Sequence, residues 1–159
     1  DGSASTTSMI IAHDGYVTKP LQPSFLAFVA NNSVNANIAV GSNVTIVFGT
    51  EVFDRGADFA SNTFTAPLEG LYQLQCNIRV QTLDSASAYY YVIIITSNRN
   101  YINIIDPDYG QDNAYFTFQL AALADMDASD TAHVVIFQAS GNSQTLVELS
   151  SSFSGYLVA

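Results

Sequence analysis

Two groups of loop aspartates are the residues of this chain whose type and spacing could do chemistry. Each group falls within one predicted turn between strands: Asp106, Asp108 and Asp112 in the first, and Asp125, Asp127 and Asp130 in the second. Calcium prefers six to eight oxygen ligands, and three carboxylates with backbone carbonyls could supply most of them. Neither group has the spacing of a helix–loop–helix calcium loop, and solvated turn aspartates give the same pattern. We therefore predict that no cofactor is required, with calcium as the one candidate ion.

A second set of loop side chains has the composition of a sugar-binding surface. Tyrosine offers a flat apolar ring to one face of a sugar, and amides offer hydrogen bonds to its hydroxyl groups. Ordinary turn usage accounts for the same residue types, so both interpretations stay open. The candidate ligand-binding residues are Asn98, Arg99, Asn100, Tyr101, Tyr109, Gln111 and Asn113.

The residues that most often act as nucleophiles or bases do not form a catalytic pattern here. The two histidines, His13 and His133, lie in no recognisable motif, and a Ser/His/Asp arrangement cannot be argued from so serine-rich a chain. Cys76 is the single cysteine, and its place in an alternating apolar run is typical of a small core residue. We predict no catalytic residue and no enzymatic activity.

The charge balance excludes several classes of partner. The 159 residues include 14 acidic and only 4 basic side chains, which gives a net charge of −10. Four basic residues cannot neutralise a phosphate backbone or bind firmly to an anionic membrane surface. Charged residues make up 11% of the chain, against ~25% in an ordinary soluble protein, so serine, threonine, asparagine and glutamine must cover the surface. No apolar run approaches the ~20 residues of a membrane span.

The elements that must position these residues are strands. Apolar and polar residues alternate with a period of two, or β-branched and aromatic residues dominate, in segments 72–81, 89–96, 113–123, 133–139 and 153–159. Leu120–Asp127 is the only candidate helix, and its strand-like neighbours favour no more than a turn there. Turn residues separate strands every 10 to 20 positions, which predicts an all-β sandwich or jelly roll.

The first part of the chain differs from the rest. Residues 1–8 are small and polar, as is typical of the cut end of a longer polypeptide or of a processed product. Pro20 and Pro23 forbid a helix at their position. We predict a connector over residues 1–23 and one domain over residues 24–159.

The run from Phe64 to Tyr72, Phe-Thr-Ala-Pro-Leu-Glu-Gly-Leu-Tyr, resembles the signature of the globular head domain of complement component 1q. Phe25–Phe28 resembles the opening strand of that family, and Ser152–Leu157 its closing strand. Phe59 lies two residues closer to Phe64 than in the family pattern, and Leu74 and Cys76 replace the usual aromatics, so the chain is similar to a distant member. The resemblance implies a jelly-roll sandwich of the C1q and tumour necrosis factor type.

The same resemblance implies a homotrimer, since the family assembles around a threefold axis. The apolar run from Tyr89 to Ile95 has aromatic or aliphatic side chains on both faces of a strand, and a second exposed apolar face favours an interface. A covering loop within one chain is the alternative. The candidate trimer-interface residues are Tyr89, Tyr91, Ile93, Tyr115 and Phe137.

The run from Gly15 to Phe25 resembles a linker of tailed-bacteriophage structural proteins, as do the runs 59–67, 95–101 and 123–131. This likeness implies a non-enzymatic tip of a tail fibre on the virion surface, binding a host-surface glycan or protein. A secreted, lectin-like C1q protein of cellular origin and a purely structural trimerising cap are the alternatives.

Overall fold

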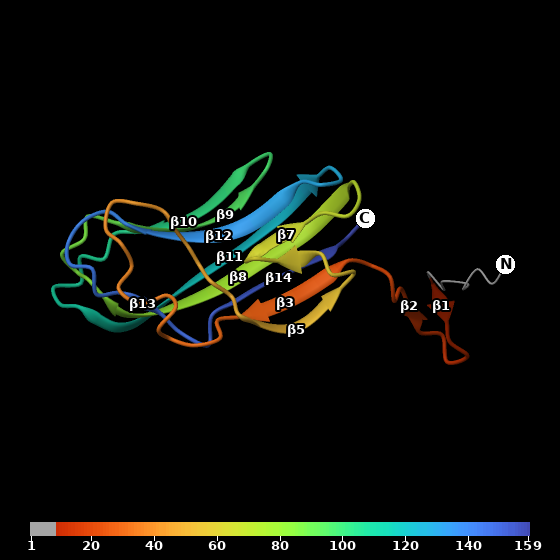
Figure 1. Cartoon of the computed structure of the whole chain (residues 1–159), viewed down its shortest axis with the longest axis horizontal. Helices are drawn as coiled ribbons and strands as arrows, with labels where there is room; N and C mark the ends of the chain where they lie inside the picture. The colour runs from red at the N-terminus through yellow and green to blue at the C-terminus, as the bar shows by residue number, and fades with distance from the viewer. Residues whose placement is uncertain (1–8) are drawn as a thin grey trace.

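The computed structural model describes residues 9–159 and contains no helix in that range. No segment of those residues is therefore a helix long and apolar enough to cross a membrane. The predicted cut end at residues 1–8 lies outside the described residues. Two antiparallel sheets pack face to face, and a short hairpin of β1 (Ile10–Ile11) and β2 (Val17–Thr18) projects from one end (Figure 1).

We name each sheet after one of its inner strands. The β9 sheet runs in the order β10 (Asn100–Ile105), β9 (Tyr90–Thr96), β12 (Thr131–Gln138), β7 (Thr63–Thr65) and β6 (Phe59–Ala60), with β4 (Val44–Thr45) also paired to β12. The β8 sheet runs in the order β11 (Asn113–Met126), β8 (Gly70–Leu83), β14 (Ser152–Leu157), β3 (Ser24–Phe28) and β5 (Thr50–Arg55), with β13 (Leu146–Val147) paired to β8.

These strands confirm the predicted all-β sandwich, and the five predicted strand segments correspond to β8, β9, β11, β12 and β14. The expectation of a turn over Leu120–Asp127 is wrong. β11 continues as a strand to Met126, because its residues stay paired with β8 as far as the Met126–Gly70 pair. The small side chains of Ala121, Ala122 and Ala124 gave that segment a helix-like composition without deciding its conformation.

An aromatic cluster joins the two sheets in the core. The Phe25 ring of β3 lies 4.9 Å from the Phe59 ring and 4.9 Å from the Phe64 ring in stacked geometry, and 5.0 Å from the Phe153 ring edge to face. Tyr72, also fully buried, donates a hydrogen bond from its hydroxyl to the Leu68 carbonyl at 2.8 Å. Offset and edge-to-face rings are the favoured arrangements for aromatic pairs, so this cluster anchors the sandwich.

Cys76 lies in the same core, as its alternating run predicts. Burial raises the pKa of its thiol to about 12, so the side chain is a neutral thiol at pH 7. A buried neutral thiol is a poor nucleophile, which agrees with the structural role.

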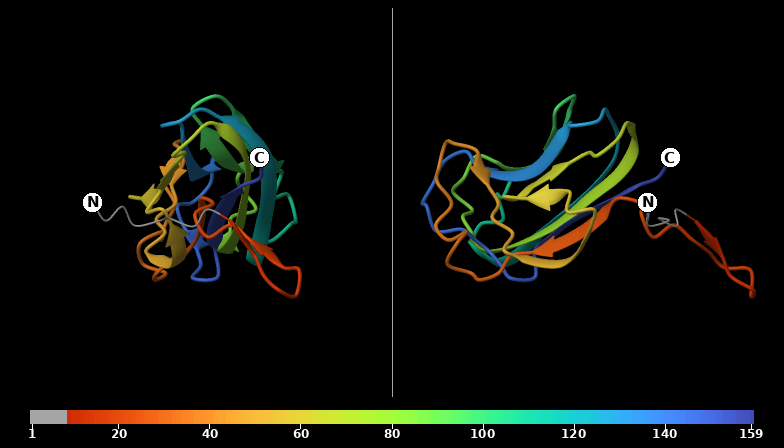
Figure 2. Two further views of the ribbon diagram at one scale, coloured as in Figure 1. Left: turned by 90° about the vertical axis from the view of Figure 1, so that its right-hand side faces the viewer. Right: turned by 45° about the vertical axis from the view of Figure 1, so that its right-hand side comes forward.

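The sandwich has two distinct ends (Figures 1 and 2). At one end, which we call the connector end, residues 9–23 lead into β3 at Ser24, and the β9–β10 and β11–β12 turns lie nearby. At the opposite loop end, the chain makes the β8–β9, β10–β11 and β12–β13 connections. Each predicted loop residue belongs to one end or the other, so this division decides which of them can act together.

Candidate functional site

A hollow of about 420 Å³ at the connector end brings together residues from the two predicted groups. It lies where the β9–β10 turn meets the end of β11 and the start of β8. Its lining comprises Leu71, Asn98, Arg99, Tyr101, Leu123 and Asp125. We call it the Arg99 hollow. Three of the predicted ligand-binding residues and one predicted calcium ligand therefore share one site.

The turn that carries Arg99 is held by local hydrogen bonds. The Thr96 hydroxyl donates to the Arg99 carbonyl at 2.8 Å and accepts the Arg99 N–H at 3.0 Å. The Ser97 N–H donates to the Thr131 carbonyl at 3.0 Å, and the Thr131 N–H donates to the Ser97 hydroxyl at 2.9 Å. The adjacent hydroxyls of Thr96 and Ser97 thus bond backbone groups of the turn and of Thr131, and they help to attach the β9–β10 hairpin to β12.

The polar groups beside Arg99 are also oriented. The Asn98 amide donates to the Asp130 carboxylate at 2.6 Å and to the Asp125 carbonyl at 3.2 Å. The Tyr101 hydroxyl donates to the Leu123 carbonyl at 3.2 Å, which fixes the position of the side chain. These bonds join β10 to the edge of β11, so the hollow is largely pre-formed.

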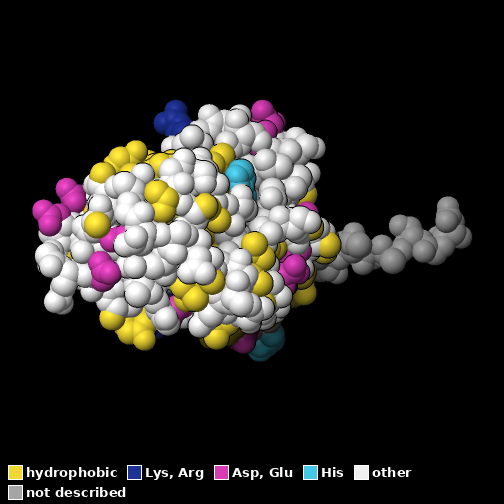
Figure 3. Space-filling view, turned by 60° about the vertical axis from the view of Figure 1, so that its left-hand side comes forward, with side chains coloured by type: hydrophobic (Ala, Val, Ile, Leu, Met, Phe, Trp, Pro, Cys, Tyr) yellow, Lys and Arg dark blue, Asp and Glu magenta, His cyan; other side chains and the backbone are white. Residues whose placement is uncertain are grey.

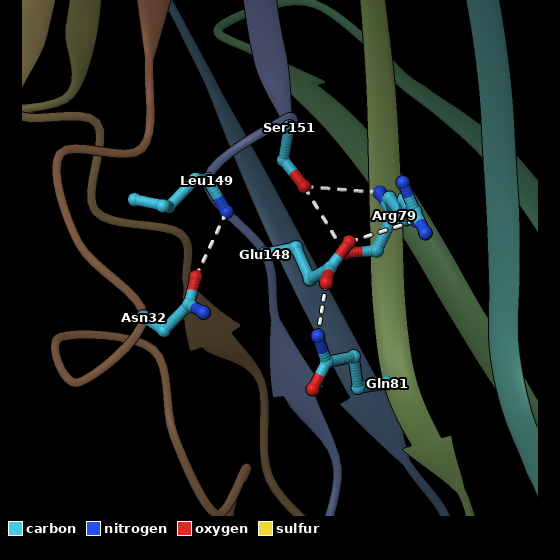
Figure 4. A network of polar contacts seen from close by, with 6 residues as sticks. All are labelled: Asn32, Arg79, Gln81, Glu148, Leu149 and Ser151. Carbon is cyan, nitrogen blue, oxygen red and sulfur yellow. Dashed lines mark hydrogen bonds and ion pairs between the residues drawn. The ribbon is translucent and has the colours of Figure 1, made fainter.

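Arg99 forms no ion pair within residues 9–159, although the Asp125 carboxylate belongs to the same hollow. Within residues 9–159 the only ion pair joins Arg79 to Glu148, whose Nε and Oε2 lie 2.7 Å apart. Figure 4 shows Arg79 on β8 beside Glu148, which follows β13, and Gln81 of β8 donates to the second Glu148 oxygen. The Arg79 guanidinium also lies 4.4 Å from the centre of the Tyr115 ring. Arg79 is therefore engaged, whereas Arg99 is available to a ligand.

The Arg99 hollow combines a guanidinium, a carboxylate, an amide, a tyrosine ring and two leucines. Donors and acceptors of this kind bind hydroxyl groups, and the apolar side chains cover the non-polar face of a ring. Leu71 and Leu123 lie on the outer face of the β8 sheet, because Leu123 pairs with Gln73 and Asp125 pairs with Leu71. Neither leucine was predicted from the sequence as a binding residue. Their signal was an apolar residue on the otherwise polar side of an alternating strand.

The structure does not bring the predicted aspartates together as groups of ligands. Within the described part of the chain, no three His, Cys, Asp or Glu side chains are placed to hold a metal ion. The Asp130 carboxylate accepts the Asn98 amide and the Asp127 N–H, which closes its own turn. Calcium binding by Asp125, Asp127 and Asp130 therefore stays a prediction, and within residues 9–159 the three carboxylates do not converge on one point.

The group at the loop end is dispersed in the same way. The Asp106 carboxylate accepts the Asp108 N–H at 3.1 Å, a local turn contact. Asp112 instead accepts the Ser85 N–H and hydroxyl and the Gln144 amide. These bonds, the Ser85 N–H first, lower the pKa of the Asp112 carboxyl. Asp112 therefore ties three loops together rather than joining Asp106 and Asp108 around an ion.

Tyr109, Gln111 and Asn113 lie at the loop end, separated from the Arg99 hollow by the length of β10. Tyr109 is exposed, and its ring lies 6.5 Å from that of Phe116. Asn100 is exposed but does not line the Arg99 hollow. The predicted ligand-binding set therefore belongs to two places on the molecule, and one small ligand cannot contact both.

The loop end is organised by one buried carboxylate. Asp84 is buried, and its carboxylate accepts the Ala86 N–H at 2.8 Å and the Asn142 N–H. Its own N–H donates to the Tyr90 hydroxyl, which also bonds the Thr145 hydroxyl at 2.7 Å. Viewed with this end turned towards the reader, acidic side chains lie scattered among apolar and uncharged ones (Figure 3).

The predicted interface residues occupy two opposite faces. Tyr89, Tyr91 and Phe137 form an aromatic row on the outer face of the β9 sheet, with the Tyr91 and Phe137 rings 4.6 Å apart and nearly parallel. Ile93 lies on that face and is 7% exposed. Tyr115 lies on the outer face of the β8 sheet. Burial lowers the pKa of His133, which shares the face of the aromatic row, so its imidazole adds no charge there at pH 7.

The strand order and the close-packed sandwich define a jelly roll of the C1q and tumour necrosis factor type. The family model of the C1q domain matches residues 27–158, and the chain belongs to this family. No curated protein matches the sequence. Among solved structures, the globular domain of zebrafish complement 1qA is 14% identical, with a TM-score of 0.61 over 87% of this chain and 98% of that one. Murine APRIL at pH 8.0 is 14% identical, with a TM-score of 0.61 over 86% of this chain and 99% of that one. At this identity the likeness shows the fold alone.

Proposed function

We propose that this domain is a non-enzymatic recognition module that binds a sugar through the Arg99 hollow. C1q-type domains are generally recognition modules, and their homologues are generally secreted or extracellular. The observation that carries the proposal is the hollow itself, whose lining combines Arg99, which forms no ion pair within residues 9–159, with Asp125, Asn98 and leucine and tyrosine side chains. That arrangement suits a ring with hydroxyl groups on its edge and carbon–hydrogen bonds on its face.

The binding test uses a defined set of probes and two matched variants. Methyl glycosides of glucose, galactose and mannose are titrated into ¹⁵N-labelled protein, and amide shifts are followed by NMR. We expect shifts around residues 97–101 and 123–125. Arg99→Ala should weaken binding by about tenfold or more, since hydrogen bonds to charged groups contribute ~1.5–3 kcal/mol.

The matched control is Tyr109→Ala, which removes a predicted ligand residue at the other end of the molecule. Unchanged affinity in this control, with loss in Arg99→Ala, supports the Arg99 hollow. If only Tyr109→Ala loses glycoside affinity, the binding site lies at the loop end and not in the Arg99 hollow. Binding of none of the glycosides, together with no signal on an array of bacterial surface polysaccharides, would contradict sugar recognition.

We propose further that the domain acts as a homotrimer. A cyclic trimer is built from heterologous contacts, in which two different surfaces of each subunit meet. The aromatic row and Tyr115 lie on opposite faces and could serve as two such surfaces. The face of the aromatic row also presents Ile95, Ile102 and Ile104, and the strands β9, β10 and β12 place no Asp, Glu, Lys or Arg on it, so it avoids repulsion between subunits of charge −10.

Light scattering should then give a mass of about 51 kDa, three times the 17.1 kDa of one chain. Tyr91→Asp places a carboxylate in the aromatic row and should shift the mass towards 17.1 kDa. Val52→Asp, at an exposed position of edge strand β5, is the control and should leave the trimer intact. A monomeric parent protein would contradict the trimer. A trimeric Tyr91→Asp variant would instead exclude the aromatic row from the interface.

The finer proposal places this trimer at the tip of a phage tail fibre or other virion appendage, where it binds a host-surface glycan or protein. Its support is the resemblance of the connector and three internal runs to phage structural proteins. A secreted C1q-type recognition protein of cellular origin is the alternative, and the family match favours it equally. Block of phage adsorption by the free domain supports the first, and a signal peptide or collagen stretch upstream supports the second.

A further inference from the structure

The four basic side chains of this chain occupy three places. Arg79 is paired with Glu148, and Arg99 lines the hollow already described. The remaining two, Lys19 and Arg55, line one separate hollow of about 450 Å³ at the junction of the connector and the domain. Tyr156 and Ser24 belong to the same lining. Half of all the positive charge in a protein of net charge −10 is thus concentrated in one place.

The fold brings this hollow together by cross-strand pairing. In the β8 sheet, Arg55 of β5 lies directly opposite Ser24 of β3, and Ser24 lies directly opposite Tyr156 of β14. Directly paired residues of antiparallel strands have their side chains on the same face of the sheet. Arg55, Ser24 and Tyr156 therefore form one transverse row on the outer face, with the half-exposed tyrosine ring beside the guanidinium.

The connector carries Lys19 over this row. Arg55 donates a hydrogen bond to the Pro20 carbonyl at 3.5 Å. The Gln22 amide donates to the Leu157 carbonyl, and the Leu157 N–H donates to the Pro23 carbonyl at 3.1 Å. These contacts hold residues 19–23 against β3, β5 and β14. Lys19 therefore lies beside the row of Arg55, Ser24 and Tyr156, although it is far from Tyr156 in the sequence.

No carboxylate of the described residues neutralises the two cations. Neither Lys19 nor Arg55 forms an ion pair within residues 9–159. Asp54 is adjacent to Arg55 in sequence, but neighbouring residues of a strand point to opposite faces. The Asp54 carboxylate instead accepts the N–H groups of Asp58 and Phe59 at 3.1 and 3.0 Å. The net negative charge of the protein is screened beyond ~8 Å at physiological salt, so these two cations dominate the local field.

We propose that the Lys19–Arg55 hollow binds an acidic sugar through its carboxylate. Arginine matches a carboxylate with two parallel hydrogen bonds, and the lysine adds a second charge. The Tyr156 ring covers the apolar face of the sugar, and the Ser24 hydroxyl bonds a ring hydroxyl. An inorganic anion would leave the tyrosine ring exposed, so the aromatic floor favours a sugar acid. This site is separate from the Arg99 hollow, and the proposal does not rest on it.

The test compares methyl β-glucuronide with methyl β-glucoside, which differ by the carboxylate. Both are titrated into ¹⁵N-labelled chain of residues 1–159 at 50 mM salt. We expect the glucuronide to shift the amides of Ser24, Arg55 and Tyr156, and to bind about tenfold or more tightly than the glucoside. Arg55→Gln should reduce glucuronide affinity by about tenfold, and Tyr156→Ala should reduce it by several-fold.

Arg99→Gln is the matched control, since it removes the same charge from another place. Glucuronide affinity unchanged in Arg99→Gln and reduced in Arg55→Gln supports the site. If Arg55→Gln and Arg99→Gln lose the same glucuronide affinity, the protein's net charge explains the binding and the site is contradicted. If the glucoside binds as tightly as the glucuronide, carboxylate recognition is contradicted. If sulfate competes with the glucuronide and Tyr156→Ala leaves the glucuronide affinity unchanged, the hollow is only a general anion site. That outcome would contradict recognition of the sugar ring. Lys19→Gln provides a second variant if Arg55→Gln melts at a lower temperature.

Discussion

Phe25→Ala should lower the free energy of unfolding by about 3–5 kcal/mol, the largest effect we expect of any substitution discussed for this chain. Phe25 is 1% exposed, and its ring contacts Phe59, Phe64 and Phe153 from both sheets. Removing it loses the transfer free energy of the ring and leaves a cavity that stiff aromatic neighbours cannot fill. Denaturant unfolding, followed by circular dichroism at a fixed protein concentration, measures the loss.

Phe53→Ala is the matched control, because the same side chain is removed from an exposed position of neighbouring strand β5. We expect a change below about 1 kcal/mol there. Equal effects of the two substitutions would show that the aromatic cluster around Phe25 does not anchor the sandwich.

Gly155→Val should destabilise the domain by about 3 kcal/mol through overpacking. A Cβ atom at this position would lie 2.7 Å from Leu74 Cδ2 and 2.8 Å from Phe25 Cε1, both in the core. It would also lie 3.2 Å from the Gln73 carbonyl oxygen, so backbone as well as side chains must move. Only a residue without a side chain lets β14 pass this closely over the aromatic cluster. Thermal unfolding by calorimetry is the measurement.

Ser154→Val places the same side chain one residue earlier, on the outer face of β14. Because valine suits a strand and the outer face has room, its melting temperature should stay within a few degrees of the parent. A Gly155→Val protein as stable as Ser154→Val would show that the strand relaxes without cost and would contradict the packing argument.

Alternation and residue type made the central strands predictable. β8 coincides closely with segment 72–81, because a half-buried strand shows its buried face with a period of two. β9 and β12 coincide closely with segments 89–96 and 133–139, because β-branched and aromatic residues dominate there. The end of β11 was not predictable in this way. Ala121–Ala124 has little strand preference, and its conformation comes from pairing with β8, more than forty residues away in sequence. At that point, pairing with a distant strand decided the backbone conformation, and the local composition did not.

The sequence by itself determined the all-β class, the resemblance to the C1q domain and the residue types that could bind a ligand. Those are local properties, since side-chain periodicity and short signatures need no long-range information. Only the tertiary structure decided which candidates act together. It placed Arg99 beside Asp125, moved Tyr109 to the opposite end and dispersed the aspartates that looked like a calcium site. It also put Lys19, Arg55 and Tyr156 into one hollow, because antiparallel register, and not sequence separation, decides which side chains are neighbours.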